Sequence, residues 1–281
     1  MEFNLRKFDM NILRERVRLD PDPKITKAPV IVLLGKTDTG KSFLVRDILY
    51  NLQSDFPIGT VICPTEVLNE MYQQLIPSRL IKDKYNPEIV QNVIRRQHEV
   101  VQQRNQVNPS VDPRAFLILD DCLYDKTWTK EESTRFLFMM GRHVHLTTMI
   151  TMQYPLGVLP DLRGNISIVF ILRENILANR LRIYDNYAGM FPTFKFFCEF
   201  MDSCTENYEC LVICNFVKSN KLEDQVFWYK AEAHPSFHMC APSLWEGNAP
   251  LTSTLLRGNE YNPGAVRKNT SIYVRKQDDK M

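Results

Sequence analysis

The stretch VIVLLGKTDTGKSFLV, residues 30–45, decides the fold. It begins with the aliphatic run VIVLL, which is typical of a strand buried on both faces of a parallel sheet. A polar loop bracketed by Gly35 and Gly40 follows, and an apolar helical segment starts near Lys41. The loop is a complete GxxxxGK[ST] pattern that lies between a strand and a helix, as a phosphate-binding loop must. The sequence therefore predicts a nucleotide-binding P-loop.

Each residue of this loop has an expected role. Gly35 and Gly40 let the backbone curl so that successive N–H groups point at phosphate oxygens, beside the positive end of the helix. The residues that supply these N–H groups between the glycines are Lys36, Thr37, Asp38 and Thr39. We expect Lys41 to reach the β- and γ-phosphates of ATP and the Ser42 hydroxyl to bind Mg²⁺.

A second acidic motif is expected for the metal, and AFLILDD, residues 115–121, supplies it. This is a buried strand that ends in two aspartates. We expect Asp120 to hold Mg²⁺ through water and Asp121 to orient or deprotonate the attacking water. The alternative for such a pair is a cap on the turn after the strand.

The segment LTTMITMQ, residues 146–153, predicts a strand that ends in a polar residue. In ATPases that insert a strand beside the P-loop strand, this residue lies near the γ-phosphate. Gln153 is therefore a candidate sensor of the γ-phosphate or ligand of the attacking water, although a glutamine at a strand end is otherwise merely solvated.

Arginines on loops are candidates for a residue that acts on the nucleotide of a neighbouring subunit. Arg142 precedes the 146–153 strand and Arg163 follows it, while Arg173 and Arg180 are further options. The alternative for each is a surface ion pair.

The rest of the chain alternates strands with helices. We expect strands at 59–64, 115–121, 146–153 and 166–172, and helices at 65–75, 87–106 and within 130–143. Two final strands within 209–232 predict an antiparallel hairpin. The fold class is thus α/β, a P-loop NTPase of the ASCE or RecA-like type, with a mainly parallel central sheet flanked by helices and a C-terminal antiparallel β-hairpin.

Three regions are expected: an N-terminal arm at 1–27, the P-loop ATPase domain at 28–241 and an extended tail at 242–281. The tail carries basic residues on both sides of an aromatic residue, and together they could bind along the phosphate backbone of a nucleic acid. The alternative is a solvated tail. The basic and aromatic residues are Arg267, Lys268, Tyr273, Arg275 and Lys276.

Composition narrows the class of protein. Of the 281 residues, 44% are hydrophobic and 24% are charged, which is ordinary for a globular protein. The net charge of +2 is too small to indicate a nucleic-acid-binding protein by itself. Seven cysteines without a CxxC pair favour a reducing compartment. The N-terminus is charged and no stretch is apolar enough to span a membrane, so we expect a soluble or peripheral protein. His234, His238 and Cys240 are residue types that bind metals, but we prefer to interpret them as part of a structured loop.

The motifs GKTDTGKS, FLILDDC, GRHVHLTTMITMQY, LPDLRGNISIVFIL and the pair CLVICNF and VFWYKA occur in this order. Together they resemble the genome-packaging ATPases of large double-stranded DNA viruses, the poxvirus-type branch of the FtsK–HerA superfamily. The resemblance covers roughly residues 28–232.

The resemblance implies an oligomeric ring, a pentamer or hexamer, that uses ATP and Mg²⁺ to move double-stranded DNA into a preformed capsid. It implies that Asp120 and Asp121 form the Walker B pair, that Gln153 is the sensor and that Arg142 or Arg163 is an arginine finger. Capsid or inner-membrane virion proteins are candidate partners, and the host cytoplasm at the viral assembly site is the expected location, with the virion as a second one. Cellular members of the superfamily usually carry Asp-Glu where this chain has Asp120 and Asp121.

Two other functions fit a P-loop. One is a kinase or another NTPase that acts on a small molecule, and the other is a nucleotide-switched scaffold without sustained turnover. The terminal hairpin and the Gln-ended strand favour the motor over a kinase. The aspartate pair and Gln153 favour turnover over a switch.

Overall fold

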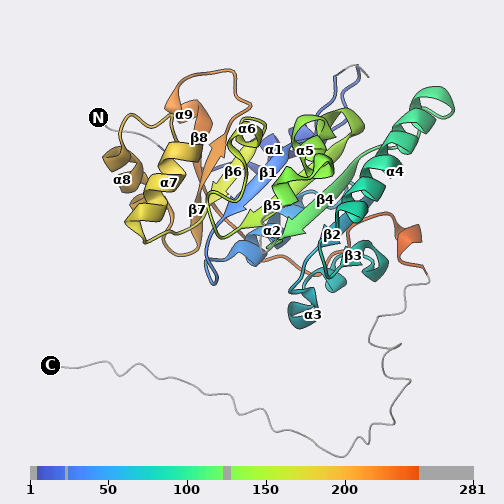
Figure 1. The fold of residues 1–281 in the computed structure, drawn as a ribbon, viewed down its shortest axis with the longest axis horizontal. Coiled ribbons are helices and arrows are strands. Elements are labelled where there is room, and N and C mark those ends of the chain that lie inside the picture. The colour runs from blue at the N-terminus through green and yellow to red at the C-terminus, as the bar shows by residue number, and fades with distance from the viewer. Residues whose placement is uncertain (1–4, 23–24, 123–127, 247–281) are drawn as a thin grey trace, which may run out of the picture. The chain divides into compact units, whose positions relative to one another are not determined.

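The computed structural model describes residues 5–22, 25–122 and 128–246 of the chain. Their centre is an eight-stranded sheet in the order β3-β2-β4-β5-β1-β6-β7-β8 (Figure 1). The strands are β1 (Val30–Leu34), β2 (Ile58–Ile62), β3 (Ile81–Lys82), β4 (Ala115–Asp120), β5 (Leu146–Met152), β6 (Ile168–Ile171), β7 (Glu209–Cys214) and β8 (Val226–Lys230). All neighbouring pairs are parallel except β6–β7 and β7–β8, which are antiparallel. The expected mainly parallel sheet with a terminal antiparallel hairpin is confirmed.

The order of the strands brings the motifs together. β5 lies between the P-loop strand β1 and the Asp120 strand β4, with Leu34 opposite Met152 and Asp120 opposite Thr151. Because these strands are parallel, their carboxyl ends meet at one edge of the sheet. The expected insertion of a strand beside the P-loop strand is therefore confirmed.

Helices cover both faces of the sheet. They are α1 (Met10–Val17), α2 (Lys41–Asn51), α3 (Glu66–Asn69), α4 (Pro87–Gln106), α5 (Glu132–Met139), α6 (Pro160–Arg163), α7 (Leu177–Tyr187), α8 (Phe194–Cys204) and α9 (Leu222–Gln225). Figure 1 shows α4, α5, α6 and α7 in front of the sheet and α1 and α2 behind it. Successive residues of β1 alternate between the two faces, since Val30 and Val32 join one apolar core and Ile31 and Leu33 the other. This explains why the P-loop strand is a continuous aliphatic run.

The N-terminal segment packs into the second of these cores. Phe8 is 1% exposed and makes edge-to-face contacts with Phe170 and Tyr229. The backbone of Lys7 forms an isolated parallel β-bridge with Trp228 at the outer edge of β8. Leu13, on α1, is fully buried. The segment that the sequence presents as a charged arm therefore extends the sheet and covers its α1–α2 face.

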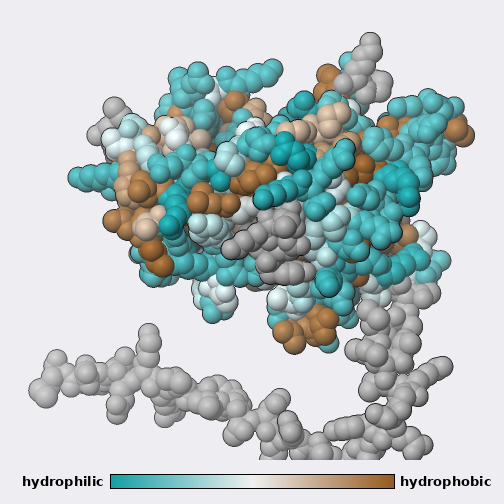
Figure 2. Space-filling model, in the orientation of Figure 1, coloured by the Kyte–Doolittle hydropathy of each residue, from teal (hydrophilic) through white to brown (hydrophobic). Residues whose placement is uncertain are grey.

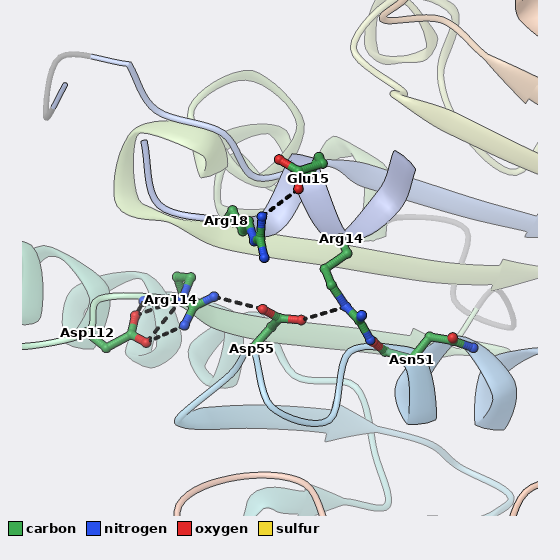
Figure 3. Close-up of polar contacts among 7 residues, drawn as sticks. All are labelled: Arg14, Glu15, Arg18, Asn51, Asp55, Asp112 and Arg114. Carbon is green, nitrogen blue, oxygen red and sulfur yellow. Dashed lines mark hydrogen bonds and ion pairs between the residues drawn. The ribbon is translucent and has the colours of Figure 1, made fainter. Parts of the chain in front are cut away.

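Polar contacts hold α1 in place (Figure 3). The Arg14 guanidinium donates to the Asn51 carbonyl at the end of α2, at 2.5 Å from Nη2, and lies 3.7 Å from Asp55. Asp55 also accepts from Arg114, which pairs with Asp112 just before β4. This network ties α1 to the loops that flank β2 and β4.

Several expected elements are confirmed closely. The helix expected at 87–106 is α4, and the helix that starts at Lys41 is α2. The expectation of one helix at 65–75 is wrong, because the chain forms only α3 and then a 3-10 turn at Tyr72–Gln74. The helix ends at Glu70, whose φ of 47° is left-handed. Helices α7 and α8 fill a region for which the sequence pattern indicated no element.

After β8, residues 231–246 run back across the α2 side of the sheet. His234 stacks on Tyr50 of α2 with ring centroids 3.8 Å apart, and its Nε2 lies within hydrogen-bond distance of the buried Asp47 carboxylate. Further along, the Ala241 N–H donates to the Pro57 carbonyl at 2.8 Å. Residues 242–246 contain a 3-10 turn at Pro242–Leu244, while the basic residues expected in the tail lie outside the described residues.

The surface carries local apolar patches. Figure 2 shows a hydrophobic patch over α3, where Val67 and Leu68 are 67% and 84% exposed. Among the described residues, no helix is both long enough and apolar enough to cross a bilayer.

Gly59, on β2, provides a test of core packing. It lies opposite Phe116 of β4, and a Cβ at this position would meet the buried phenyl ring at 1.9 Å. We predict that Gly59→Ala lowers the free energy of unfolding by about 1–3 kcal/mol, because the ring has to move within a filled core. Urea denaturation measures this. Gly189→Ala is the matched control, since no atom lies within 4 Å of its added Cβ; equal losses in the two variants would contradict the packing.

Candidate nucleotide-binding site

A cleft of about 960 Å³ opens at the carboxyl edge of the parallel strands. Its walls come from the P-loop, the ends of β4 and β5, and the segment 63–72 after β2. Of the residues singled out from the sequence, the cleft is lined by Lys36, Thr37, Asp38, Gly40, Lys41, Ser42, Asp120, Asp121 and Gln153. Four separate segments of the chain therefore converge on one site.

The two loop glycines have physical reasons to be glycine. Gly40, the N-cap of α2, has a φ of 96°, a conformation that side chains with a Cβ rarely adopt. A Cβ at Gly35 would lie 2.6 Å from the Thr39 hydroxyl and 3.0 Å from Leu172. The Thr39 hydroxyl itself donates to the Lys36 carbonyl at 2.7 Å, which closes the loop.

Lys41 folds back over this loop. Its ammonium Nζ donates to the carbonyl oxygens of Gly35, at 2.6 Å, and Lys36, at 3.1 Å. Burial lowers the pKa of Lys41, while the nearby charges of Asp121 and Asp120 oppose this shift. The arrangement holds a cation where the loop would receive the phosphates of a nucleotide.

The second P-loop lysine ties the loop to the next strand. Lys36 Nζ lies 2.6 Å from Glu174 Oε1 and 3.0 Å from Asn175 Oδ1, both just after β6. Glu174 is 5% exposed and also accepts from the Ile176 N–H and the Asn179 amide. Burial alone would raise the pKa of Glu174, but these hydrogen bonds and the Lys36 charge lower it. Lys36 thus anchors the loop through a nearly buried carboxylate.

Asp120 is fixed by hydroxyl groups on both sides. Thr151 of β5 donates to Oδ1 at 2.5 Å, and the buried Tyr72 donates to Oδ2 at 2.9 Å. The Cys63 thiol lies 3.6 Å from the same Oδ2, and burial together with the Asp120 charge raises its pKa to about 12. The carboxylate is therefore oriented by neutral donors before any metal binds.

Asp121 and Gln153 lie beside each other, as their expected roles require. Gln153 Nε2 is 2.6 Å from Asp121 Oδ2, and its Oε1 is 3.5 Å from the Thr37 hydroxyl of the P-loop. Asp121 adopts a left-handed φ of 52°, and its N–H donates to the Thr151 hydroxyl at 3.0 Å. The Asp121 carboxylate therefore contacts Gln153, whereas the Asp120 carboxylate contacts Thr151 and Tyr72.

The donor set fits Mg²⁺ bound together with a nucleotide. Ser42 is exposed in the first turn of α2, and Asp120 lines the same cleft. Mg²⁺ prefers oxygen ligands and commonly takes one or two from protein, with phosphates and water supplying the rest. In the described part of the chain no three His, Cys, Asp or Glu side chains gather to hold a metal alone.

Sequence reasoning missed part of the cleft. Glu66 is 3% exposed, its Oε1 accepts from the Gln73 N–H, and its Oε2 is buried without a partner. Burial raises the pKa of Glu66. Tyr72 and the exposed rings of Phe43 and Tyr208 also line the cleft. The wrong assignment of 65–75 to one helix hid Glu66 and Tyr72, and nothing in the local pattern marks Tyr208.

Neither leading arginine candidate lines this cleft. Arg142 lies in a 3-10 turn before β5, at the amino edge of the sheet, and is exposed. Arg163, on α6, donates to the Val158 carbonyl at 2.9 Å and to the Asn186 side chain. Arg173 is exposed just after β6, and Arg180 pairs with Asp202 at 2.7 Å.

The residues considered as metal ligands, His234, His238 and Cys240, make other contacts. His234 pairs with Asp47, whereas His238 lies 4.3 Å, between ring centroids, from Trp245. Cys240 is a free thiol, and burial raises its pKa to about 11.

Solved structures with the same fold include P-loop enzymes. The genome-packaging NTPase B204 of Sulfolobus turreted icosahedral virus 2, in complex with ATP-γ-S, matches with a TM-score of 0.50 and 12% identity. The match covers 72% of this chain and 97% of that one. The pCW3 conjugation coupling protein TcpA, also with ATP-γ-S, matches with a TM-score of 0.50 and 16% identity over 73% of this chain and 60% of that one. The fold is that of the P-loop NTPases, as the FtsK–HerA resemblance implied.

Sequence relatives come from viruses. Protein L437 of Acanthamoeba polyphaga mimivirus is 37% identical over 234 residues, covering 82% of this chain and 78% of its own length. Protein 088R of Invertebrate iridescent virus 3 is 38% identical over 213 residues, covering 76% and 78%. Protein 075L of Invertebrate iridescent virus 6 is 34% identical over 230 residues, covering 82% and 86%. The chain therefore belongs to the family of large DNA virus proteins that includes these three, while no protein-family model matches it.

The Lys36–Glu174 contact generates a prediction of pH-dependent stability. The folded pKa of Glu174 lies below its unfolded value of about 4.3, so its contribution is fully present above that pH and is lost as the pH falls through the folded pKa. We predict that Glu174→Gln lowers the urea midpoint near pH 7 and that the gap to the wild type narrows at about pH 3.5.

The matched control is Glu232→Gln, which removes an exposed ion pair with Lys7. It should change the free energy of unfolding by no more than about 1 kcal/mol at either pH. A gap for Glu174→Gln that is equal at both pH values would contradict the assigned charge interaction.

Proposed function

We propose that this protein is an ATP-hydrolysing motor that moves double-stranded DNA into a viral capsid as a homo-oligomeric ring. The observation that carries the proposal is the single cleft in which Lys41, Asp120 and the Asp121–Gln153 pair meet. A P-loop lysine and a metal-binding carboxylate suffice for nucleotide binding, whereas a carboxylate joined to a glutamine amide adds the means to position water.

The residues of the cleft divide the work of hydrolysis. Lys41 exchanges the carbonyls of Gly35 and Lys36 for phosphate oxygens of ATP, and the α2 N-terminus adds N–H donors. Ser42 and Asp120 would hold Mg²⁺, which would neutralise charge on the phosphates. Asp121 accepts a proton from the attacking water while Gln153 fixes the geometry of both.

Beyond the part of the cleft expected to hold the phosphates, the cleft offers apolar surface for the nucleobase of ATP. Phe43 and Tyr208 are 45% and 69% exposed at the cleft, and their rings supply apolar area against which a nucleobase can pack. Glu66 provides a further carboxylate in the cleft, so it is the alternative to Asp121 as the general base.

The viral role rests on the relatives and on the similar solved structures. The relatives are proteins of large DNA viruses, and one structure of the same fold is a genome-packaging NTPase. Packaging places the protein at the viral assembly site in the host cytoplasm, in contact with DNA and with capsid or membrane proteins of the virion. A small-molecule kinase and a nucleotide-switched scaffold are the competing functions.

The steady-state ATPase rate tests the proposal, measured over a range of protein concentration with and without linear double-stranded DNA. A motor completed by neighbouring subunits shows a rate per subunit that climbs with concentration and rises further with DNA. A rate that is indifferent to both, but is raised by a nucleoside or another small acceptor, would identify a kinase. Nucleotide binding without turnover under all conditions would identify a scaffold.

Asp121 is predicted to be the general base. Asp121→Asn should keep ATP affinity within a few-fold, because the P-loop and Asp120 are intact, and should lower kcat by about 10²–10⁴-fold. Single-turnover hydrolysis and ATP-γ-S binding measure the two effects separately. Glu66→Gln is the comparison variant and should retain most of the rate; a large loss there, with Asp121→Asn active, would transfer the role to Glu66.

Arg142 is the better candidate for the arginine finger, since it is exposed and has no carboxylate partner within the described ranges. Arg163, in contrast, donates hydrogen bonds to Val158 and Asn186. Arg142→Gln is predicted to preserve ATP affinity and to lower turnover by about 10³-fold or more. Arg163→Gln should instead lower stability, measured by thermal melting. Wild-type turnover in Arg142→Gln would remove Arg142 from this role.

A further inference from the structure

A second pocket, of about 210 Å³, lies at the amino edge of the parallel strands. It is bounded by Arg16 of α1, by Val30 at the start of β1, by Asn165 and Ser167 before β6, and by Phe216 after β7. The P-loop follows the opposite end of β1, and the five residues of this strand span roughly 16 Å. The pocket is therefore separate from the nucleotide cleft of the same chain.

Among the residues that the structure describes, two arginines and no acidic residue line this pocket. Arg16 contributes one guanidinium and Arg142, from the turn before β5, contributes the other. Within the described ranges of the chain neither arginine has a carboxylate partner. Arg114 and Arg180, by contrast, are paired with aspartates. The pocket thus concentrates positive charge that no described residue of its wall neutralises.

Arg16 is held in this position despite an incomplete set of hydrogen bonds. Its guanidinium carbon lies 4.6 Å from the centroid of the Phe216 ring, and its Nε is buried without a partner. Burial lowers the pKa of Arg16, and the charge of Arg142 lowers it further. A buried donor left unpaired beside a second cation is costly, and an anion bound between the two arginines would relieve both effects.

Neutral donors complete the wall. The Ser167 hydroxyl oxygen accepts from the Val30 N–H at 3.2 Å, so its own proton is directed elsewhere. Asn215 uses one amide hydrogen for the Ile166 carbonyl at 2.9 Å and retains a second one. Planar guanidinium groups with hydroxyl and amide donors are the set that recognises phosphate oxygens.

We propose that this pocket, with Arg16 and Arg142 as its cationic ligands, is a second phosphate-binding site of the protein. Its volume is below the roughly 300 Å³ at which pockets begin to hold drug-sized ligands, so it takes one phosphoryl group and not a whole nucleotide. The inference stands on the pocket alone and does not require the proposed motor function.

Binding of inorganic phosphate tests the proposal. Calorimetric titration is done on full-length Lys41→Ala protein, so that the P-loop does not compete for the anion. We expect one site per chain, weakened about tenfold or more by adding Arg16→Gln or Arg142→Gln, with Arg16→Lys retaining part of the affinity. Arg18→Gln is the matched control, because Arg18 lies two residues away, is exposed and pairs with Glu15.

Phosphate binding that is absent, or that is unchanged in both Arg16→Gln and Arg142→Gln, would overturn the proposal. Circular dichroism melting confirms that each variant is folded before its affinity is compared. Because α1 is also held by Arg14 and the buried Leu13, Arg16→Gln is not expected to unfold the chain.

A mixing experiment separates the two sources of the phosphoryl group. Lys41→Ala protein keeps the pocket, and Arg16→Gln/Arg142→Gln protein keeps the P-loop. Recovery of ATP turnover on mixing means that the pocket receives the terminal phosphate of a nucleotide bound to a second copy. Absence of recovery, with pocket-dependent phosphate binding intact, means that the ligand is free phosphate.

Discussion

The parallel pairing of β5 between β1 and β4 is the constraint on which the rest of the site depends. It places Asp120 opposite Thr151 and Leu34 opposite Met152, so the P-loop, the aspartate pair and Gln153 all emerge at one edge. A slip of one residue in this register would turn Thr151 away from Asp120 and move the core-facing side chains of β5 to the other face. These strands are buried on both faces of the sheet, and their packing holds the register that the chemistry requires.

Polar contacts then convert this framework into a preorganised cleft. Thr151 and Tyr72 orient Asp120, Gln153 holds Asp121, and Glu174 holds the P-loop through Lys36. The residues that touch the expected substrate are therefore supported by partners on three segments: the end of β5, the turn at Tyr72 and the segment after β6. Such support limits the reorganisation needed when charge develops on the phosphates.

Local patterns were sufficient to predict every strand of the sheet except β3, together with most of the residues that line the cleft. The apolar runs at 30–34 and 115–119 have strong signals, because burial on both faces demands uninterrupted apolar residues. The stretch that ends at Gln153 has a weaker signal, since three threonines interrupt its apolar residues. The contact of Tyr72 with Asp120, beyond the break at Glu70, could not be predicted, since it joins segments that are far apart in the sequence. The Arg16–Arg142 pocket was hidden for the same reason, as its two arginines are far apart in the sequence and meet only when α1 packs on the sheet.

A crystal structure of the protein with ATP-γ-S and Mg²⁺ tests the central claim most directly. The account predicts that the nucleotide occupies the cleft at the carboxyl edge of the sheet. In this complex Lys41 Nζ has left the Gly35 and Lys36 carbonyls for phosphate oxygens, and Mg²⁺ lies between the Ser42 hydroxyl and the Asp120 carboxylate. A nucleotide bound at another place, or bound in the cleft with Lys41 still on the loop carbonyls, would contradict it.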